Sequence, residues 1–514
     1  MSDHAILSGH ATPAVTGAYP ARFPQWRGGY RPLGGTGLIA SRVGFGGYRV
    51  DDETRAHRTA LEAALLGGIN LIDTSTNYTD GGSERLVGAT LGDLVAQGRL
   101  RRDEIVVVSK IGYAQGANLT LAREREAAGQ PFPEMVKYMD GCWHCLHPAF
   151  LDDQLQRSLA RLRLATLDVC LLHNPEYFLS DAKKRGGGAL ETRREEFYRR
   201  VREAFCFFES QVRAGRIDAY GVSSNTAVVS AGDAEATSLS RFLTAAREAG
   251  GADHHFRVLQ IPMNLVESGG ALEPNTGPGG TETALACATR EGIAVLVNRP
   301  LNAFAEGGMI RLAEAPLGAA PLDPVAQRAV VSGLEEEFRR AIAPSVRAAR
   351  GGTTPDALFR WAEHLDGAED QVDGVERWRE IEEHAIAPRV THTVAALDRA
   401  LTLGAWTAWR DRYLPELQRL LEAIGQRTAG RSAARSRAVS ALVDPLLSAA
   451  RGAETLSRKA LWVLASTPGV SSILVGMRRQ AYVQDALGMM AWPPLSNPYD
   501  VYEAMRHARA SDPE

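Results

Sequence analysis

The sequence predicts an α/β fold: a (β/α)8 barrel of eight parallel strands alternating with helices, with a large helical insertion after the seventh strand. Apolar segments of strand length alternate with longer segments of helical periodicity along most of the chain. The run 104–109 (EIVVVS) is rich in β-branched residues, which is typical of a strand buried on both faces. An open doubly wound sheet is the competing architecture for this alternation.

Eight segments have the length and composition of buried strands. They are 43–45, 70–72, 104–109, 167–172, 217–222, 258–261, 294–297 and 472–475, and a short hairpin within 33–48 precedes the first. Amphipathic spacing predicts helices at 55–66, 83–94, 151–162, 193–212, 239–249, 282–291, 454–465 and 481–489. Strand and helix therefore alternate as a parallel barrel requires.

Two stretches interrupt this alternation. Residues 114–145 contain charged residues, prolines and glycines and are predicted as a loop. Residues between 300 and 454 show amphipathic helical spacing at 335–349, 355–364 and 406–424. The predicted organisation is a flexible N-terminal segment (1–30), a barrel (31–300 and 454–492), a mainly helical insertion (301–453) and a C-terminal tail (493–514).

Composition excludes several classes of partner. With 58 basic and 61 acidic residues and a net charge of −3, the chain has no basic field suited to nucleic acid. It has no signal-peptide pattern and no apolar run of about 18 residues, so we expect a cytoplasmic protein that does not enter a membrane. The five cysteines are an odd number, which fits a reducing compartment. Oligomeric state is left open.

Four polar residues stand at or just after predicted strand ends, where barrel enzymes carry their catalysts. Asp73 and Tyr78 follow the second strand, Lys110 ends the third and His173 ends the fourth. A tyrosine hydroxyl has a pKa of about 10, so it needs a neighbouring cation to act as an acid near neutrality. Lys110 can supply that cation, Asp73 can keep it charged, and His173 can orient a carbonyl or share the proton.

Each of these residues also has a purely structural explanation. Lys110 fits a solvated strand end, Tyr78 a packed aromatic, Asp73 a turn cap and His173 a hydrogen-bonded imidazole. Their joint occurrence after three consecutive strands favours a catalytic site.

The same segments resemble the aldo-keto reductase superfamily. The similar segments are LGGTGLIASRVGFGGY, GINLIDTSTNY, GGSERLVGATL, IVVVSKIGY, LDVCLLHNPE, AYGVSS, GIAVLVNRPL and GVSSILVGMRRQAYVQDAL. The resemblance runs from about residue 31 to 487, outside the two interruptions. It implies the barrel, a nicotinamide cofactor bound in extended form without a Rossmann fold, and the catalytic tetrad Asp73, Tyr78, Lys110 and His173.

Carried over position by position, the resemblance also implies a cofactor site. The implied contacts are Gly46, Gly47 and Tyr48 after strand one, Ser223, Ser224 and Gln260 at the carboxamide, Arg299, Pro300 and Leu301 over the pyrophosphate, and Gly476, Arg478 and Arg479 at the adenosine phosphate. Two guanidiniums at a helix start suit a 2′-phosphate, so NADP(H) is preferred and NAD(H) is the alternative. A solvated helix start is the competing explanation of the basic pair.

Two positions depart from the family pattern. Many members have Ser-Asn after the fifth strand, whereas this chain has Ser223, Ser224 and Asn225, so the second carboxamide contact falls to Ser224, to Asn225 or to neither. Asn298 stands where many members place an aromatic residue that stacks on the nicotinamide.

A GCWHCLHP element contains Cys142, His144, Cys145 and His147. A CxxC pair can bind zinc, but structural zinc sites draw further ligands from a second pair, which the sequence lacks. Redox cycling of the two thiols is another alternative. We favour a loop that lines the substrate pocket, with Trp143 as a packing or substrate contact, and we expect no metal.

The function expected from these features is NAD(P)H-dependent reduction of an aldehyde, ketone or sugar-type carbonyl, reversible as alcohol oxidation, with Tyr78 as general acid. The alternative is a nicotinamide-binding regulatory or scaffold subunit, with the helical insertion as a docking surface. A hydrolase or aldolase that uses Lys110 as a Schiff-base amine leaves the basic pair without a purpose. Specificity lies in loops, here 114–145, 177–193 and the insertion, so the small-molecule substrate is not determined.

Overall fold

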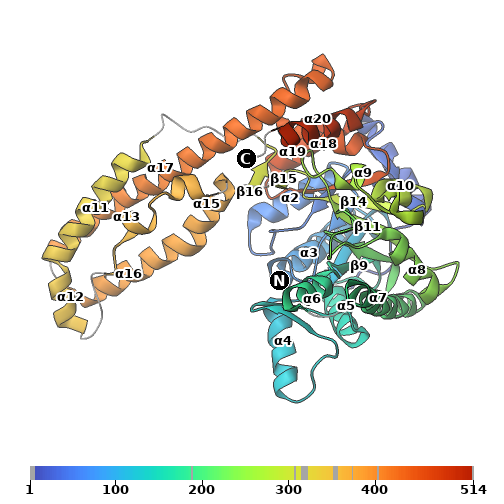
Figure 1. Cartoon of the computed structure of the whole chain (residues 1–514), viewed down its shortest axis with the longest axis horizontal. Coiled ribbons are helices and arrows are strands. Elements are labelled where there is room, and N and C mark those ends of the chain that lie inside the picture. Colours follow the sequence, from blue (N-terminus) through green and yellow to red (C-terminus); the bar gives the residue numbers. More distant parts are fainter. Residues whose placement is uncertain are drawn as a thin grey trace. The chain divides into compact units, whose positions relative to one another are not determined.

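The computed structural model describes residues 6–186, 189–305, 308–313, 322–350, 357–372, 374–401 and 404–511. The chain divides into two compact units. The first comprises Met1–Leu301 and Arg458–Pro513, and the second comprises Asn302–Ser457. Figure 1 shows the first unit as strands among helices and the second as a set of long helices.

The first unit contains a closed barrel of eight parallel strands, which confirms the predicted fold class. In the order in which they follow one another in the chain, the strands are β3 (Val43–Gly46), β4 (Leu71–Asp73), β5 (Val106–Ile111), β9 (Leu167–His173), β10 (Ile217–Ser223), β11 (Phe256–Pro262), β14 (Ala294–Asn298) and β17 (Val470–Gly476). Each pairs with its neighbours in this order, and β17 pairs with β3 to close the barrel. All eight predicted strands are present, with ends within two residues of the predicted ones.

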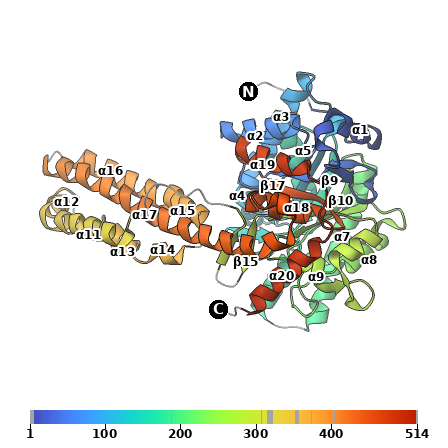
Figure 2. The ribbon, with the colours of Figure 1, turned by 90° about the horizontal axis from the view of Figure 1, so that it is seen from above.

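Helices surround the barrel strands in both views (Figures 1 and 2). They are α2 (Arg55–Leu66), α3 (Gly82–Ala96), α5 (Pro148–Leu162), α7 (Leu190–Arg213), α8 (Leu239–Gly250), α10 (Ala284–Arg290), α18 (Leu456–Ser466) and α19 (Gln480–Met490). Their apolar faces are buried, as in α8, where Phe242 and Leu243 lie in the core. Each such side chain contributes roughly 1.5–3 kcal/mol of transfer free energy when it leaves water.

The barrel interior is filled by alternate residues of the strands. Val106 and Val108 of β5, for example, belong to one buried cluster with Leu171 of β9 and Leu296 of β14. A hairpin of β1 (Tyr30–Pro32) and β2 (Ile39–Ser41) precedes β3, and Leu33 from its loop joins the same cluster. The packed interior holds the strand ends, and therefore the polar residues after them, in fixed positions.

Residues 6–30, which were predicted as part of a flexible N-terminal segment, contain regular elements. They form α1 (Pro13–Ala18) and two 3-10 turns, Tyr19–Arg22 and Pro24–Trp26. The Ala11 amide donates to Asp168 Oδ1 at 2.6 Å, and Tyr19, which is buried, donates to the Leu65 carbonyl at 3.2 Å. Buried aromatic side chains and backbone hydrogen bonds fix this segment, although its composition is polar.

The segment 114–145, predicted as a loop, is also regular. It contains α4 (Gly116–Ala127) and a three-stranded antiparallel sheet of β6 (Tyr113–Ala114), β8 (Cys142–His144) and β7 (Val136–Met139), with β8 in the centre. Because β8 has only three residues, the alternation of buried and exposed side chains that marks a strand cannot be recognised in its sequence. Beyond the barrel strands the chain adds α6 (Tyr177–Arg185), α9 (Gly269–Leu272) and the pair β12 (Pro274–Thr276) and β13 (Glu282–Thr283).

The C-terminal tail contains a helix that the sequence analysis missed, α20 (Pro498–Ser511). Its Tyr502 is buried and its hydroxyl lies 2.7 Å from Thr467 Oγ1. In the part of the chain that the structure describes, none of the helices combines the length and apolar character needed to cross a membrane.

The second unit is helical apart from the pair β15 (Asn302–Ala305) and β16 (Gly308–Arg311). Its helices are α11 (Pro324–Ala341), α12 (Ala343–Arg350), α13 (Trp361–His364), α14 (Ala368–Gln371), α15 (Val375–Ile381), a π-helical turn (Glu382–Ile386), α16 (Ala387–Ala400) and α17 (Gly404–Val443). The helices predicted at 335–349 and 406–424 lie within α11, α12 and α17. Of the helix predicted at 355–364, only α13 forms, and residues 355 and 356 lie outside the described residues.

Aromatic residues build the core of this helical unit. Trp409 stacks on Tyr413 with ring centroids 4.4 Å apart, and its indole N–H donates to the Leu334 carbonyl at 2.7 Å. Trp378 donates to the Leu421 carbonyl at 3.1 Å. The helices α11, α16 and α17 run side by side in Figures 1 and 2. Large aromatic rings with satisfied N–H groups give this unit a core of its own.

Candidate active site

The predicted tetrad comes together at the carboxyl ends of three neighbouring strands. Asp73 ends β4, Lys110 lies in the last part of β5, and His173 ends β9. Tyr78 follows β4 in a short turn, Tyr78–Gly81. Because β4, β5 and β9 pair in parallel register, their ends meet at one face of the barrel.

Lys110 is the centre of this group. Its ammonium Nζ lies 2.6 Å from Asp73 Oδ2, 3.0 Å from Tyr78 Oη and 3.0 Å from the Thr74 carbonyl oxygen. The same nitrogen lies 4.6 Å from the centroid of the Tyr78 ring. Lys110 is completely buried, and three acceptors satisfy its three N–H donors. Lys110 thus places a cation in hydrogen-bond contact with the phenolic oxygen of Tyr78.

Burial and charge oppose each other in setting the pKa values of this group. Burial alone would lower the pKa of Lys110, but Asp73 and Tyr78 together raise it above its usual value. Burial raises the pKa of Tyr78, and the Lys110 ammonium offsets part of that rise. Tyr78 is therefore a neutral phenol near pH 7, hydrogen-bonded to a cation that stabilises its conjugate base.

His173 completes the group from the other side of Tyr78. The two rings meet edge to face with centroids 5.8 Å apart, and Tyr113 meets His173 in the same way at 4.7 Å. Burial, followed by the charges of Lys110 and His144, lowers the pKa of His173 well below its usual value. His173 is therefore neutral at physiological pH and acts through hydrogen bonds rather than as an imidazolium.

A second layer of hydrogen bonds holds Asp73 from the opposite side. Gln260 at the end of β11 donates from Nε2 to Asp73 Oδ1 at 2.7 Å. The side-chain oxygen Oε1 of Gln260 accepts from Asn298 Nδ2 at 3.2 Å and from the Ser223 hydroxyl at 3.3 Å. The Oδ1 atom of Asn298 is buried and has no hydrogen-bond partner among the described residues. A buried acceptor without a partner at the end of a strand is suited to accept a hydrogen bond from a ligand.

Several of the predicted cofactor contacts lie around the same face. Gly46 pairs with Asp73 and with Gly476, so β3, β4 and β17 end together. The ring centroid of Tyr48 is 5.3 Å from that of Tyr78. A Cβ atom at Gly47 would lie 2.6 Å from Ser83 Oγ, so only glycine fits there. At Gly476, by contrast, the space within 4 Å is open.

The remaining predicted contacts follow β14 and β17. Arg299, which precedes Pro300 and Leu301, has φ 54° and pairs with Glu267 at 3.1 Å. Left-handed backbone at a non-glycine residue costs about 1–3 kcal/mol and is concentrated at functional sites. Arg479 is the residue before the first turn of α19, is exposed, and has no side-chain partner among the described residues. Arg478 precedes it and is half-buried.

The side chain of Ser224 hydrogen-bonds threonine side chains rather than members of the tetrad. Its hydroxyl lies 2.9 Å from Thr237 Oγ1, and the backbone amide of Asn225 donates to Glu176 Oε1 at 2.6 Å. Glu176, in the loop after β9, is 3% exposed, and burial raises its pKa to about 7. Sequence analysis missed Glu176, although its place three residues after His173 is a signal of proximity to the site.

We expect Glu176→Gln to remove a pH dependence of stability. Between its ordinary value of 4.5 and about 7, only the folded state keeps the Glu176 proton, so stability falls as pH rises through that window. The loss is about 3 kcal/mol, at roughly 1.4 kcal/mol for each pKa unit. Urea titrations at pH 5 and pH 8 should show the variant gaining stability over wild type at the higher pH. A difference that is the same at both pH values contradicts this assignment of the raised pKa.

The first three residues of the CWHC element form β8, Cys145 follows the strand, and the side chains have separate environments. His144 donates from Nε2 to the His173 carbonyl at 2.7 Å, and burial lowers the pKa of His144 to about 4. Cys145 is buried against the Pro133 carbonyl, and burial raises the pKa of its thiol to about 12. His147 caps α5 by accepting from the Ala149 amide. No cluster of three or more metal-binding side chains occurs among the described residues.

Trp143 is not brought to the tetrad. It packs against a small cluster that includes Phe132 and Phe150. The cations of Lys137 and Arg123 lie over its ring, 4.7 and 5.5 Å from the centroid. Of the two roles considered for Trp143, packing is the one its contacts show.

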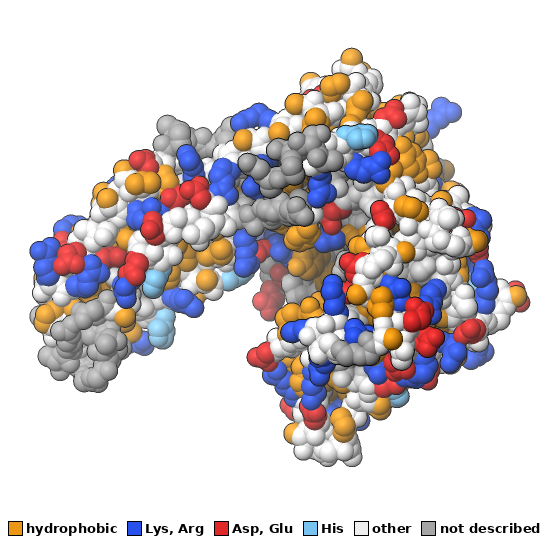
Figure 3. Space-filling model, viewed as in Figure 1, with side chains coloured by type: hydrophobic (Ala, Val, Ile, Leu, Met, Phe, Trp, Pro, Cys, Tyr) orange, Lys and Arg blue, Asp and Glu red, His pale blue; other side chains and the backbone are white. Residues whose placement is uncertain are grey.

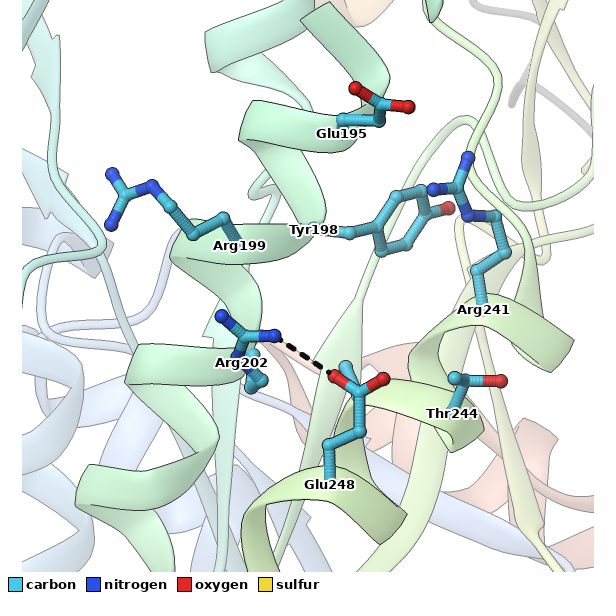
Figure 4. Close-up of a pocket in the computed structure, with 8 residues that line it drawn as sticks. Glu195, Tyr198, Arg199, Arg202, Arg241, Thr244 and Glu248 are labelled. Atoms are coloured by element: carbon cyan, nitrogen blue, oxygen red, sulfur yellow. Dashed lines mark hydrogen bonds and ion pairs between the residues drawn. The ribbon is translucent and has the colours of Figure 1, made fainter. Parts of the chain in front are cut away.

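A groove on the outside of the barrel is unrelated to this site (Figure 4). It lies between α7 and α8, where Arg202 pairs with Glu248 at 3.2 Å and Arg241 lies over the Tyr198 ring at 4.1 Å. Every arginine of the groove has a glutamate partner, including Arg199 with Glu196 and Arg241 with Glu191. On the face shown in Figure 3, basic and acidic side chains are likewise interspersed.

Comparison with known proteins gives one family. The profile of the aldo/keto reductase family matches residues 42–266. The aldo-keto reductase AMT2 of Alternaria alternata is 28% identical over 157 residues, which is 29% of this chain and 41% of that protein. The NADH-specific methylglyoxal reductase of Escherichia coli is 28% identical over 154 residues, 28% of this chain and 40% of that protein. The chain thus spans about two fifths of the length of these relatives.

Among solved structures, the glycerol dehydrogenase AKR11B4 of Gluconobacter oxydans aligns with 95% of this chain and 98% of its own, at 16% identity and a TM-score of 0.47. The matched residues 42–266 include β3 to β11 and all four tetrad residues. Within this chain of 514 residues, the part from 42 to 266 is similar to the aldo/keto reductase family.

Proposed function

We propose that this protein is an NAD(P)(H)-dependent oxidoreductase that reduces a carbonyl group by hydride transfer, reversibly, with Tyr78 as general acid. The observation that carries the proposal is the position of the Lys110 ammonium, 2.6 Å from Asp73 Oδ2 and 3.0 Å from Tyr78 Oη. A buried cation bound to a phenol lowers the cost of removing the phenolic proton. That is what proton donation to a developing alkoxide requires.

Features of the structure fit the nicotinamide cofactor that the family uses. The orphaned Asn298 Oδ1, beside Gln260, is an acceptor suited to the N–H groups of a carboxamide. The open space at Gly476 and the N-terminus of α19 behind it suit a phosphate. When bound, the reduced nicotinamide supplies the hydride that converts the carbonyl carbon to a carbinol carbon.

The residues of the chain then carry out the proton transfer. Tyr78 donates its hydroxyl proton to the substrate oxygen as negative charge develops there, and its own oxygen becomes the anion. Lys110 stabilises that anion, while Asp73, held by Gln260, keeps Lys110 charged and in place. In the oxidation direction Tyr78 takes the proton back from the alcohol. Because Lys110 and Asp73 are buried, their charges act at a lower effective dielectric than in water.

We further propose a preference for NADP(H) over NAD(H), supported by Arg478 and Arg479 at the start of α19. The E. coli relative is named NADH-specific, so the preference is a property to be tested on this chain. We expect Arg479→Ala to raise the Kd for NADPH about tenfold and to leave that for NADH unchanged, since it removes one charge-assisted contact to the 2′-phosphate. Fluorescence titration measures both constants, with Arg213→Ala, an exposed arginine of α7, as the matched control.

The proposal as a whole is tested by titrating the protein with NADPH and NADH and then following cofactor oxidation against a panel of aldehydes, ketones and sugars. Binding with turnover of at least one carbonyl supports it. Binding without turnover of any carbonyl favours the regulatory or scaffold alternative. Failure to bind either cofactor excludes both.

A further inference from the structure

The backbone directly after Tyr78 forms a left-handed turn. Thr79 and Asp80 have φ values of 47° and 53°, and Gly81 follows with φ 79°, so three consecutive residues are left-handed. Asparagine, aspartate and above all glycine tolerate this conformation, whereas a β-branched residue such as Thr79 adopts it only under constraint. Backbone strain of this kind persists where the surrounding structure fixes it, and it is concentrated at functional sites.

Thr79 is fixed by the loop after β3. Its hydroxyl donates to the Val50 carbonyl oxygen at 2.6 Å, and Val50 is completely buried. The Arg85 guanidinium of α3 donates to the Asp80 carbonyl oxygen at 3.3 Å and pairs with Asp52 at 2.9 Å. Because Val50 and Asp52 belong to the same loop, these bonds tie the left-handed turn to the segment that follows β3.

Asp80 is fixed by the N-terminus of α4. Its Oδ1 atom accepts from the Ala117 amide at 2.9 Å. The N-cap residue of α4, Gln115, makes no side-chain capping hydrogen bond, so the Asp80 carboxylate caps the helix in its place. A Cβ atom at Gly116 would overlap Asp80 Oδ1. The close approach of Asp80 to the start of α4 therefore depends on glycine at this position.

The start of α4 also contacts the chain on the other side of Tyr78. Asn77, the preceding residue, donates from Nδ2 to Gln115 Oε1 at 2.8 Å. Between these two attachments, the Tyr78 hydroxyl lies 3.0 Å from Lys110 Nζ. Displacing a reacting group by about 1 Å can cost on the order of 100-fold in rate. The left-handed turn is therefore placed where it can set the position of the proton donor.

We propose that Thr79 and Asp80 are positioning residues that hold the Tyr78 hydroxyl at Lys110 through the left-handed turn. This inference rests on the proposed function, because it concerns the placement of the proposed general acid. It gives α4, and with it the segment 114–145, a part in the chemistry as the support of the turn. Thr79→Gly and Asp80→Gly keep the left-handed backbone accessible but remove the side-chain hydrogen bond. Thr79→Ser and Asp80→Asn keep the oxygen that makes it.

The environment of the Tyr78 hydroxyl is measured by 13C NMR of the cofactor-free protein labelled at the ring carbon Cζ of tyrosine. The Tyr78 signal is identified by its absence from the spectrum of Tyr78→Phe. In Thr79→Gly and in Asp80→Gly we expect this signal to move from its wild-type position, because the hydrogen bond to Lys110 weakens. In Thr79→Ser and Asp80→Asn it should stay at the wild-type position.

Asp323→Gly is the matched control for the loss of a helix-capping carboxylate. Asp323 caps α11 in the helical unit by accepting from the Val325 amide at 3.0 Å, and its loss should leave the Tyr78 signal unchanged. An unchanged signal in either Thr79→Gly or Asp80→Gly overturns the role of that residue. A shift as large in Asp80→Asn as in Asp80→Gly overturns the role of the hydrogen bond to α4.

Kinetics on a carbonyl that the protein reduces give a second readout. Thr79→Gly and Asp80→Gly should each lower kcat about tenfold and leave the Kd for NADPH unchanged, because the donor is misplaced while the proposed cofactor contacts are kept. Asp80→Asn should retain the wild-type kcat. Wild-type kcat in both glycine variants contradicts the proposal. Absence of turnover with every carbonyl contradicts the proposed function instead, and the NMR spectra then decide this inference by themselves.

Discussion

Tyr78→Phe should lower kcat for carbonyl reduction by a factor of about 10² to 10⁴, the range expected for loss of a positioned general acid. The substitution removes the hydroxyl, which is the group 3.0 Å from Lys110 Nζ, and keeps the ring that packs against Tyr48 and His173. Because burial raises the pKa of Tyr78, the wild-type phenol is protonated at neutral pH and can donate its proton. Steady-state kinetics on the best carbonyl of the panel measures the loss.

Measuring cofactor binding distinguishes loss of the proton donor from loss of the folded site. The Kd for NADPH should be unchanged in Tyr78→Phe, since the proposed contacts to the cofactor lie on other residues. Tyr499→Phe, on α20, removes a phenolic hydroxyl away from the site and should keep full turnover. Retention of wild-type kcat by Tyr78→Phe contradicts the assignment of Tyr78 as the proton donor.

Lys110→Met should abolish turnover and also destabilise the barrel by about 3–5 kcal/mol at neutral pH, because it leaves a buried carboxylate without its cation. Among the described residues, the Asp73 carboxylate would keep the side chain of Gln260, at 2.7 Å, as its hydrogen-bond donor. Burial already raises the pKa of Asp73, and loss of Lys110 raises it further. The folded variant then holds a proton that the unfolded chain releases, so its stability falls as pH rises.

Urea unfolding of Lys110→Met at pH 5 and pH 8 should therefore show the larger deficit at pH 8. The double variant Asp73→Asn with Lys110→Met has no buried charge and keeps a side chain that Gln260 can bond. It should recover most of the lost stability while remaining inactive. Equal stability of the single variant and wild type, or no recovery in the double variant, would mean that the pair is not a buried ion pair.

The barrel could be predicted because each strand is an apolar run that is buried on both faces. Such a run, as in β5, can be recognised as a strand from its composition alone, without knowledge of the strands that pair with it. The regions that were missed depend on contacts between distant segments. The strand β8 exists because β6 and β7 flank it, and α20 is fixed by the packing of Tyr502 near Thr467. Local periodicity in three residues or in a polar tail does not contain that information.

The tetrad could be predicted for a related reason. In a parallel barrel, a polar residue after each strand must lie near those after the neighbouring strands, so Asp73, Lys110 and His173 had to meet. Roles that depend on the direction of a hydrogen bond could not be predicted in the same way. Ser75 and Asn77 lie in the same LIDTSTNY segment as Asp73 and Tyr78, but the contact of 2.9 Å between Ser75 Oγ and His173 Nδ1 depends on the folded arrangement.

The central claim is that this barrel transfers a hydride from a nicotinamide to a carbonyl carbon. Its most direct test is incubation with NADPH deuterated at C4 on either face, together with the carbonyl panel, followed by mass spectrometry and NMR of the alcohol formed. We expect one deuterium on the carbinol carbon from one of the two labelled faces, and none with Tyr78→Phe over the same time. An alcohol that forms without deuterium from either face would contradict it.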